Sequence, residues 1–400
     1  MKILVVCQYY YPEPFRITDI CETLVQHGHN VTVLTGLPNY PEGRVVYNYR
    51  WGRKRKEIIN GVKIVRVFEI GRGASSITLF LSYISYMVSG SIKALLNKEI
   101  YDVIFVNQLS PILMGIPAVI YKKKHHKKLL LYCLDLWPAS LFAGNIKENS
   151  PTYKLFFSIS KWIYSKADKI LITSKMFEDY FRKILSITTD DIEYLPQYAE
   201  DLFENNMEIS TKTEIEKNYY NFVFAGNIGD MQSVETIIKA ANELRDSNNI
   251  KFHIIGDGSK LYSCKRLATD LKLTNVMFYG RRPVEEMPQF YKMADAMIIT
   301  LKNNEVISYT LPGKVQSYMA AAKPIIGSVN GETQRIINES ECGLCCNAED
   351  YMELANIIMS YCKTDKKEEM SVRSQKYYCD NFKKEQFMCR LEEILSNLGG

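Results

Sequence analysis

The chain has 400 residues, of which 46% are hydrophobic and 24% are charged. This composition excludes a disordered or fibrous protein, and the length favours two domains of roughly 200 residues each. The net charge of +5 is unevenly shared: residues 1–200 carry 26 Lys and Arg against 17 Asp and Glu, and residues 201–400 carry 24 against 28. The basic first half favours a negatively charged partner, such as a phosphate-bearing acceptor, an anionic lipid or a nucleic acid.

The apolar run at the start, Met1–Cys7, ends at Gln8 and is followed by a Tyr-Pro turn, which is typical of a first strand and not of a secretory signal. The ten cysteines follow no disulfide framework, and this fits a reducing cytosol. Cys342, Cys345 and Cys346 form a C-x-x-C-C cluster. A metal site there would lack a second ligand pair, so reduced core thiols are the favoured interpretation.

Short apolar runs alternate with segments of helical period along both halves. In the helical segment Ile17–His27, for example, the apolar residues lie at helix spacing and Gly28 follows as a stop signal. The predicted strands are Lys2–Cys7, Val31–Thr35, Val62–Val67, Val103–Asn107, Leu129–Leu134, Lys169–Thr173, Ile192–Leu195, Asn221–Ala225, Lys251–Ile255, Val276–Tyr279, Ala296–Thr300, Pro324–Gly327 and Gly343–Cys346. The alternation predicts an α/β protein with two Rossmann-like domains, each containing one parallel sheet. The expected domains are residues 1–198 and 199–379, the polar stretch Ala199–Lys217 is the expected linker, and a helix at about 380–398 is expected to pack back on the first domain.

The segment Ile77–Leu96 is rich in Leu, Ile, Tyr and Met, and it has the length of a membrane span. Its serines, Thr78 and Gly90 favour a buried or interfacial helix instead.

Parallel sheets bind ligands at the carboxyl ends of their strands, so the loops after the strands hold the candidate site residues. The loop after the first strand, Gln8–Arg16, contains no G-x-G-x-x-G motif, which argues against a dehydrogenase. It offers tyrosine rings and a guanidinium, groups that suit sugars and phosphates, so Tyr11 and Arg16 are candidates for acceptor binding. The alternative is a proline-stiffened turn with a surface arginine.

Glycine turns follow two strands of the second half. Gly226 and Gly229 follow one predicted strand, and Gly256 and Gly258 follow the next. Such turns let a phosphate approach backbone N–H groups and a helix start. Each turn alone is weak, but two in one sheet favour a nucleotide site.

The segment Tyr309–Pro324 predicts a helix with Pro312 as its first residue. Its inward stripe would consist of Val315, Tyr318, Met319 and Ala322, with Lys314 and Ser317 on a different face. A lysine in the first turn opposes the helix dipole unless an anion lies nearby, and a diphosphate would supply that anion. The alternative is a solvated lysine.

These motifs together resemble glycosyltransferase family 4, a large family of retaining enzymes with the GT-B fold, and the resemblance covers essentially the whole chain. The Gly28–Thr35 segment, Ala294-Asp295 and the Pro-Gly-Lys helix followed by Ala-Ala-Ala-Lys-Pro carry it. A branch that transfers N-acetylated deoxy-amino sugars (N-acetylfucosamine type) in bacterial surface polysaccharide assembly is similar in four further segments: Glu13–Ile20, Leu37–Pro41, Asp135–Pro138 and Lys314–Met319. The resemblance implies two Rossmann-like domains facing across a cleft, with the donor bound by the second.

The chain departs from the family pattern at its donor site. The E-x7-E pair would fall on Tyr309 and Ser317, and the Arg and Lys of the phosphate clamp would fall on Asn227 and Gln232. Lys314 is then the best candidate cation for the diphosphate, and Ser317 could bond a ribose hydroxyl. The donor-binding residues that the resemblance implies are Gly226, Asn227, Gly229, Gln232, Gly256, Gly258, Arg281, Arg282, Thr310, Leu311, Lys314 and Ser317.

Asp135 closes a predicted strand and would face the cleft in the family layout, where it could orient the acceptor hydroxyl or take its proton. Asp135 and Lys314 are therefore the catalytic candidates, although a structural cap on the Trp-Pro turn would equally explain Asp135.

The expected reaction is retaining, metal-independent glycosyl transfer of the hexosyltransferase type with no cofactor, since no Asp-x-Asp motif occurs in the chain. The expected partners are a nucleotide-sugar donor (a UDP-sugar by the resemblance), a lipid-diphosphate-linked saccharide acceptor and an anionic membrane surface. The expected location is the inner face of the cytoplasmic membrane, because Arg53–Lys56 and Lys122–Lys128 are basic runs. A GT-B epimerase of nucleotide-sugars, a catalytically weak scaffold protein and a nucleic-acid binder are the alternatives, and the last lacks any recognisable binding motif.

Overall fold

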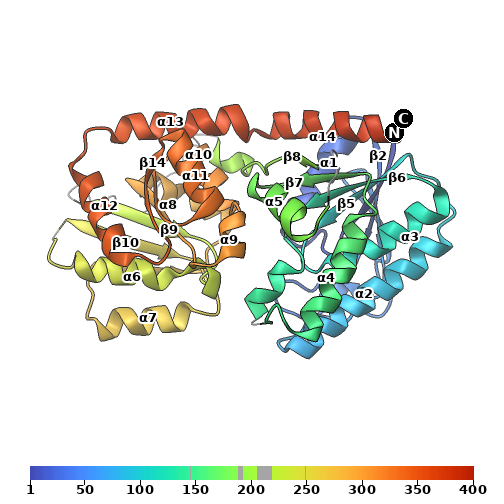
Figure 1. Cartoon of the computed structure of the whole chain (residues 1–400), viewed down its shortest axis with the longest axis horizontal. Coiled ribbons are helices and arrows are strands. Elements are labelled where there is room, and N and C mark those ends of the chain that lie inside the picture. Colours follow the sequence, from blue (N-terminus) through green and yellow to red (C-terminus); the bar gives the residue numbers. More distant parts are fainter. Residues whose placement is uncertain (145, 188–191, 205–218, 248) are drawn as a thin grey trace. The chain divides into compact units, whose positions relative to one another are not determined.

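The computed structural model describes residues 1–144, 146–187, 192–204, 219–247 and 249–400 (Figure 1). The chain divides into two compact units. The first unit is Met1–Leu195 together with Met388–Gly400, and the second is Pro196–Phe387.

The first unit is built on a sheet whose strands, in the described residues, run in the order β3-β4-β2-β1-β5-β6-β7-β8. All neighbours are parallel except β3 and β4, which form an antiparallel pair at one edge. The strands are β1 (Lys2–Val6), β2 (Asn30–Thr35), β3 (Lys56–Ile59), β4 (Val62–Arg66), β5 (Val103–Gln108), β6 (Lys128–Cys133), β7 (Lys169–Ile172) and β8 (Ile192–Tyr194). Every residue of β5 is buried, as expected for a central parallel strand covered on both faces.

Helices cover both faces of this sheet, and α2 and α3 run side by side in Figure 1. The helices of the first unit are α1 (Ile17–Gln26), α2 (Ser76–Leu96), α3 (Ile116–His125), α4 (Pro151–Tyr164) and α5 (Met176–Asp179), joined by short helical turns at Tyr47–Tyr49, Ile112–Gly115, Ala139–Gly144 and Tyr180–Ile184. Helix α1 buries Ile17, Ile20 and Leu24 at helical spacing. Helix α2 begins at a capping box, in which the Ser75 hydroxyl accepts the Thr78 N–H.

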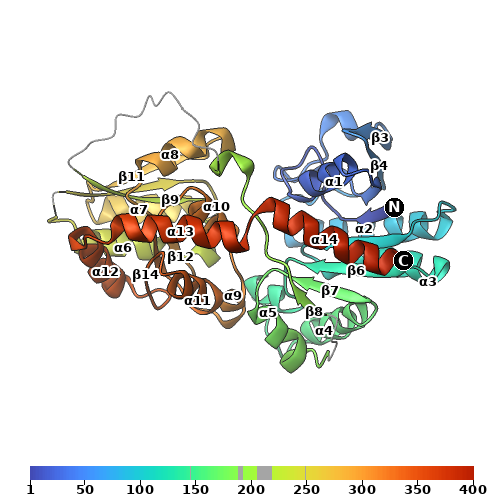
Figure 2. The ribbon, with the colours of Figure 1, turned by 90° about the horizontal axis from the view of Figure 1, so that it is seen from above.

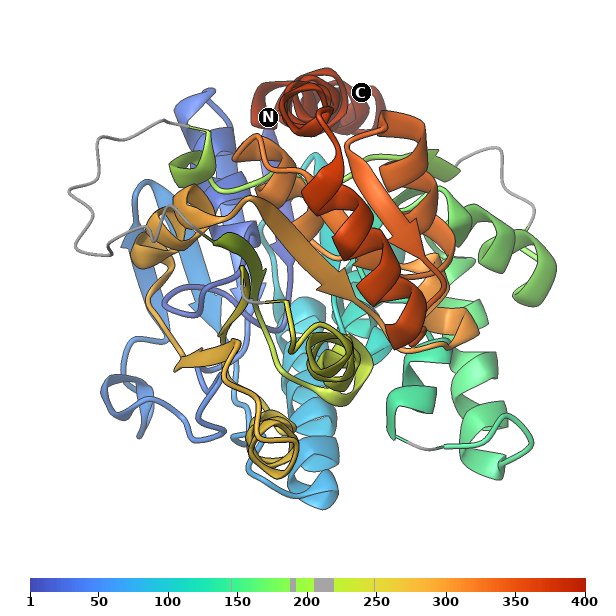
Figure 3. The same cartoon turned by 90° about the vertical axis from the view of Figure 1, so that its left-hand side faces the viewer.

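The second unit contains a fully parallel sheet in the order β11-β10-β9-β12-β13-β14, seen from its own side in Figure 3. The strands are β9 (Tyr220–Ala225), β10 (Ile250–Ile255), β11 (Val276–Gly280), β12 (Ala296–Thr300), β13 (Ile325–Ser328) and β14 (Gly343–Cys346). Two apolar clusters flank it, one around Val223, Met297 and Val315 and the other around Phe222, Ile238 and Ile298. Successive residues of a strand thus serve opposite faces of the sheet.

The helices of the second unit are α6 (Val234–Glu243), α7 (Leu261–Asp270), α8 (Met287–Met293), α9 (Glu305–Tyr309), α10 (Lys314–Ala320), α11 (Gly331–Ser340), α12 (Tyr351–Lys363) and α13 (Lys367–Asn381), with helical turns at Asp201–Phe203, Asp230–Gln232 and Val284–Glu286. Figure 2 shows α13 followed by the last helix, α14 (Lys384–Gly399). Most of α14 belongs to the first unit, where Arg390 pairs with Glu193.

The predicted α/β architecture with one sheet in each half is confirmed, and every predicted strand is present. The prediction missed β3 and its antiparallel pairing. Of the predicted linker, Ala199–Glu204 packs in the second unit, where Ala199 is fully buried, and 205–217 lie outside the described residues.

Candidate active site in the second unit

The ends of β9 and β10 form a paired turn in which backbones touch. Gly226, Gly256 and Gly258 have φ values of +142°, +148° and +156°, which side-chain-bearing residues rarely adopt. A Cβ on Gly256 would lie 1.8 Å from the main-chain oxygen of Gly226, so a larger residue cannot occupy this position. The Ile228 N–H donates to the Asp257 carbonyl at 2.9 Å and joins the two loops. The predicted glycine turns therefore lie together at the carboxyl edge of the sheet.

Lys314, the first residue of α10, directs its ammonium group into this turn. The residue as a whole is half-buried, but its Nζ atom is covered and has no hydrogen-bond partner among the described residues. Nζ lies 3.9 Å from the centroid of the Phe224 ring and 2.9 Å from the position that a Cβ on Gly226 would take. A buried ammonium without a counter-ion is unfavourable, and burial accordingly lowers the pKa of Lys314 to about 7. An anion bound at the paired turn would offset this cost.

The local structure of α10 differs from the prediction in three respects. The helix begins at Lys314 and not at Pro312, and Gly313 is the residue before it. Val315, Tyr318 and Met319 are buried as predicted, but Ala322 lies beyond the helix with a φ of +53°. Ser317 was expected on a different face from the apolar stripe, yet it is also buried because the whole helix lies inside the unit.

The two positions that the resemblance assigns to a phosphate clamp hold amides that bond to each other. Asn227 Nδ2 donates to Gln232 Oε1 at 3.1 Å, and the Gly229 N–H donates to the same oxygen at 3.2 Å. These neutral groups shape the loop and bring no charge. Among the residues that the sequence singled out, Lys314 is therefore the cation that points into the turn.

Sequence reasoning missed two lysines near this edge of the sheet. Lys302 follows β12 and Lys260 precedes α7, and their Nζ atoms lie 2.7 and 3.2 Å from the carboxylate of Asp230. The hydrogen bonds from these lysines lower the pKa of Asp230. No motif identifies this cluster, because the three residues come from separate loops.

The remaining donor candidates are positioned by backbone interactions. Thr310 Oγ1 donates to the Ile307 carbonyl at 2.7 Å, and Leu311 is buried in the core cluster. Arg281 and Arg282 are both exposed after β11, and Arg282 donates to the Tyr279 carbonyl and lies 3.8 Å from Glu286. Arg281 is thus the better placed of the two arginines to meet a ligand.

Asp135, the catalytic candidate of the first unit, follows β6 and accepts the Ser110 N–H at 3.0 Å. The Ser110 hydroxyl in turn accepts Trp137 Nε1 at 2.9 Å, so the carboxyl does help to order the Trp-Pro turn. Burial raises the pKa of Asp135, and the Ser110 hydrogen bonds oppose that rise. The geometry is compatible with both the capping and the proton-accepting role.

The acceptor candidates Tyr11 and Arg16 lie in the loop after β1. Tyr11 is 40% exposed, and its carbonyl accepts Arg66 Nη2 at 2.7 Å. Arg16 occupies the N-cap position of α1, and the helix start receives no capping hydrogen bond from its side chain.

Two buried carboxyl groups, Glu13 within this loop and Glu69 after β4, were not predicted as site residues. Glu13 accepts the N–H groups of Asn39 and Tyr40 at 2.8 and 2.7 Å, and burial raises its pKa to about 7. Glu69 Oε1 accepts Gln8 Nε2 at 2.7 Å and the Ser82 hydroxyl at 2.9 Å, and burial raises the pKa of Glu69 to about 8. The signal available in the sequence was a lone glutamate within an apolar or aromatic segment at each strand end.

The thiols of the C-x-x-C-C cluster belong to two buried cysteines, Cys342 and Cys346, and to the half-buried Cys345. Within the described residues no group of three or more His, Cys, Asp or Glu could hold a metal ion. Burial raises the pKa values of the Cys342 and Cys346 thiols to about 11, and the Cys345 thiol donates to Asn338 Oδ1 at 3.2 Å.

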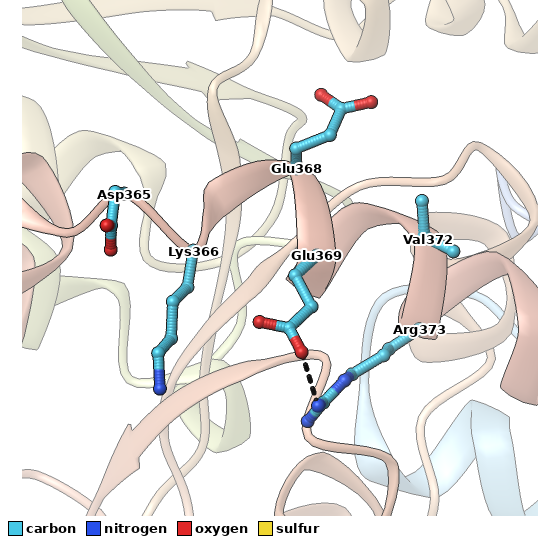
Figure 4. A pocket seen from close by; sticks show the side chains of 6 residues that line it. All are labelled: Asp365, Lys366, Glu368, Glu369, Val372 and Arg373. Carbon is cyan, nitrogen blue, oxygen red and sulfur yellow. Dashed lines mark hydrogen bonds and ion pairs between the residues drawn. The ribbon is translucent and has the colours of Figure 1, made fainter.

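An open depression of about 730 Å³ lies along the start of α13 and is lined by Asp365, Lys366, Glu368, Glu369, Val372 and Arg373 (Figure 4). Arg373 is already paired with Glu369 and Glu341. The residues that line the depression come from α13 and the turn before it, whereas ligands of parallel sheets bind at the loops that follow the strands. The paired glycine turn with Lys314 is therefore the candidate active site.

Solved structures share this fold over the whole chain. Sucrose-phosphate synthase from Thermosynechococcus elongatus matches with a TM-score of 0.75 and 15% identity, covering 99% of this chain and 98% of that one. HepE from Anabaena, solved in complex with UDP, matches with a TM-score of 0.73 and 15% identity over 100% of both chains. The two Rossmann-like units thus define the GT-B fold, as the sequence predicted.

Family profiles and curated relatives narrow the class. Residues 16–197 match "Glycosyltransferase Family 4", and residues 205–377 match "Glycosyl transferases group 1". The two profiles together span most of the chain, and both describe glycosyltransferases.

Two curated relatives come from bacteria. "Probable glycosyltransferase WbjE" of Pseudomonas aeruginosa is 28% identical over 64% of each chain. WcaI of Escherichia coli K12, named as a colanic acid biosynthesis glycosyl transferase, is 23% identical over 80% of this chain and 81% of its own.

Proposed function

We propose that the protein transfers a sugar from a nucleoside diphosphate donor to a lipid-diphosphate-linked saccharide, with retention of configuration, in bacterial capsule or O-antigen synthesis. The observation that carries this proposal is the buried ammonium of Lys314 at the glycine turn of β9 and β10, which lacks a counter-ion in the described part of the chain. The names of WbjE and WcaI support the polysaccharide context, and UDP bound to HepE supports a UDP-sugar as donor. The resemblance of the sequence motifs is what supports an N-acetylated deoxy-amino sugar as the transferred group.

In this mechanism Lys314 and backbone N–H groups of the paired turn stabilise the negative charge that develops on the leaving diphosphate. Arg281 contacts the base, and Asp135 accepts the proton of the attacking hydroxyl. The chemistry needs no metal for charge neutralisation, because the lysine and the turn supply it.

A thermal-shift panel tests the donor half of the proposal. UDP, GDP, ADP and dTDP are added at millimolar concentration to the wild type and to Lys314→Met. A ligand at one hundred times its Kd stabilises the folded state by about 2.7 kcal/mol, so the nucleotide that binds raises the wild-type Tm. If none of the four shifts the wild-type Tm, the protein does not use such a donor.

We further propose that the protein works at the inner surface of the cytoplasmic membrane, with α2 lying in the interface. Helix α2 is long and apolar enough to cross a membrane, but only 22% of its most apolar window is buried. Its buried face consists of Ser82, Tyr86, Gly90 and Ala94, while its exposed face carries Ile77, Phe80, Leu81, Val88, Ile92 and Leu95. This is the reverse of a soluble helix, whose apolar face is buried, and it fits an in-plane membrane anchor.

The basic runs contribute less to membrane binding than the number of their lysines and arginines suggests. Lys122 and Lys128 both pair with Asp168, and Lys124 donates to the Leu95 and Asn97 carbonyls at the end of α2. A basic residue near an anionic leaflet contributes about 1 kcal/mol, so apolar contact from α2 carries much of the binding.

Co-sedimentation of the full chain with vesicles tests this surface. Phosphatidylcholine vesicles with and without phosphatidylglycerol are compared for the wild type and Ile92→Asp, and Val372→Asp on α13 is the matched control because Val372 is similarly exposed. Binding is expected to need anionic lipid, to weaken with salt and to be lost only in Ile92→Asp. Equal binding of both variants would remove the proposal.

A further inference from the structure

The carboxylate of Glu200 contacts Ser317, which lies about one helical turn after Lys314. From the sequence, Ser317 was a candidate only for a weak hydrogen bond through its hydroxyl. Ser317 Oγ donates to Glu200 Oε2 at 3.2 Å. Ser317 stands three residues after Lys314 on α10, so the two side chains leave the helix on neighbouring positions. Glu200 comes from the segment that enters the second unit, and it is exposed while Ser317 is buried.

The rest of that segment is held firmly, which fixes where Glu200 lies. Ala199 is fully buried in the cluster that contains Val315 and Tyr318, and the Tyr198 ring packs against Phe387 with a centroid distance of 5.0 Å. Phe203 stacks on Tyr291 at 4.7 Å. The carboxylate is therefore presented beside α10 from a rigid support and is not a freely moving surface group.

The chemistry of a nucleoside diphosphate matches this arrangement. Its ribose is joined to the first phosphate by one methylene group and one ester oxygen, so a ribose must lie close to any cation that holds the diphosphate. Neighbouring hydroxyls of a ribose are hydrogen-bond donors, and an ionised carboxylate is the strongest acceptor that a protein offers them. A serine hydroxyl alone would bind them more weakly.

We propose that Glu200, held by Ser317, binds the ribose hydroxyls of the donor nucleotide. The site thus regains from another segment the carboxylate that α10 itself lacks. This inference rests on the proposed function, because it takes the anion at Lys314 to be a nucleoside diphosphate.

Calorimetric titration with UDP and 2′-deoxyUDP separates the ribose contact from the rest of the site. The wild type is expected to bind UDP about ten- to a hundred-fold more tightly than 2′-deoxyUDP, the range of a hydrogen bond to a charged group. In Glu200→Ala the two ligands are expected to bind equally, because neither retains a contact with the carboxylate. If GDP is the nucleotide that shifts the Tm, GDP and 2′-deoxyGDP replace the pair.

Asp201→Asn is the matched control, because Asp201 is the next carboxylate of the same segment and faces Lys384 at 3.8 Å. It is expected to keep the wild-type preference for the ribonucleotide. Lys314→Met is expected to abolish binding of both ligands, since it removes the cation that holds the phosphates.

Two results overturn the inference alone: a wild type that binds both forms equally, or a Glu200→Ala variant that keeps the preference. Failure of every nucleoside diphosphate to bind the wild type overturns the proposed function together with the inference.

Discussion

Replacing Lys314 by methionine should stabilise the protein while it abolishes binding of the nucleoside diphosphate. Burial lowers the pKa of this lysine from 10.5 to about 7, whereas the unfolded chain keeps the ordinary value. One pKa unit corresponds to about 1.4 kcal/mol, so the ionisation of Lys314 reduces the free energy of unfolding at pH 7 by up to about 4 kcal/mol. Methionine has a similar length and retains the packing on Phe224 without the charge.

The sign of the pH dependence follows from the proton count. Between pH 7 and pH 10.5 the unfolded lysine holds a proton that the folded one has lost, so this group makes the wild type more stable as the pH rises through that window. The difference between wild type and Lys314→Met is therefore greatest at pH 7 and below, and it disappears near pH 10.5. Taking the difference cancels the other titrating groups, Glu13 and Glu69 among them.

Urea denaturation at pH 7 and at pH 9, with and without UDP, measures both effects. The expected outcome is a higher midpoint for the variant without ligand and a UDP-induced increase in the wild type alone. Phe224→Leu, which removes the ring beneath the ammonium, is the packing control and should lower the midpoint in both conditions. A Lys314→Met variant that is less stable than the wild type, or that still responds to UDP, would refute the account of Lys314 as a strained anion receptor.

Three further predictions concern single groups. Nucleotide binding should take up a proton above pH 7, because a diphosphate raises the pKa of Lys314 from about 7; calorimetry in two buffers of different ionisation enthalpy measures this, and Lys314→Met should show no uptake from this group. Ala322→Gly should raise the free energy of unfolding by about 1 kcal/mol, and the Tm by about 2–4 °C, because Ala322 has a φ of +53° that glycine adopts without strain; an unchanged Tm would contradict the strain. Asp135→Asn should lower kcat by about a hundredfold or more at an unchanged Tm, because the amide oxygen still accepts the Ser110 N–H but no longer takes a proton; activity within a few-fold of the wild type would leave Asp135 a structural cap.

The sequence predicted the strands well because a buried parallel strand contains a continuous apolar run, as in Val103–Val106 of β5 and Phe222–Ala225 of β9. It failed at β3, where an edge strand alternates between exposed and half-buried residues and begins in the basic run Arg53–Lys56. A turn signal was available, since Asn60 and Gly61 both have positive φ values and join β3 to β4 as a hairpin.

Side-chain environments were predicted less well, because they depend on residues far apart in the chain. Lys314 was expected at the donor site, but its burial depends on Phe224, which lies ninety positions earlier. From the sequence alone, the lysines of the run Lys122–Lys128 were expected to be free charges. In the structure, Asp168 from another loop pairs with two of them. Residue types and local spacing thus predict a candidate site without giving its electrostatics.

The departures from the family pattern have a common physical consequence. Amides replace the clamp cations at Asn227 and Gln232, and Ser317 stands where the family places a carboxylate. A site with fewer fixed charges can hold a diphosphate only if its remaining cation is strong, and a cation gains strength when water and counter-ions are kept away from it. The orphaned ammonium of Lys314 and the carboxylate of Glu200 on a rigid segment are what such a site requires. The absence of the glutamates is therefore compatible with the proposed donor site.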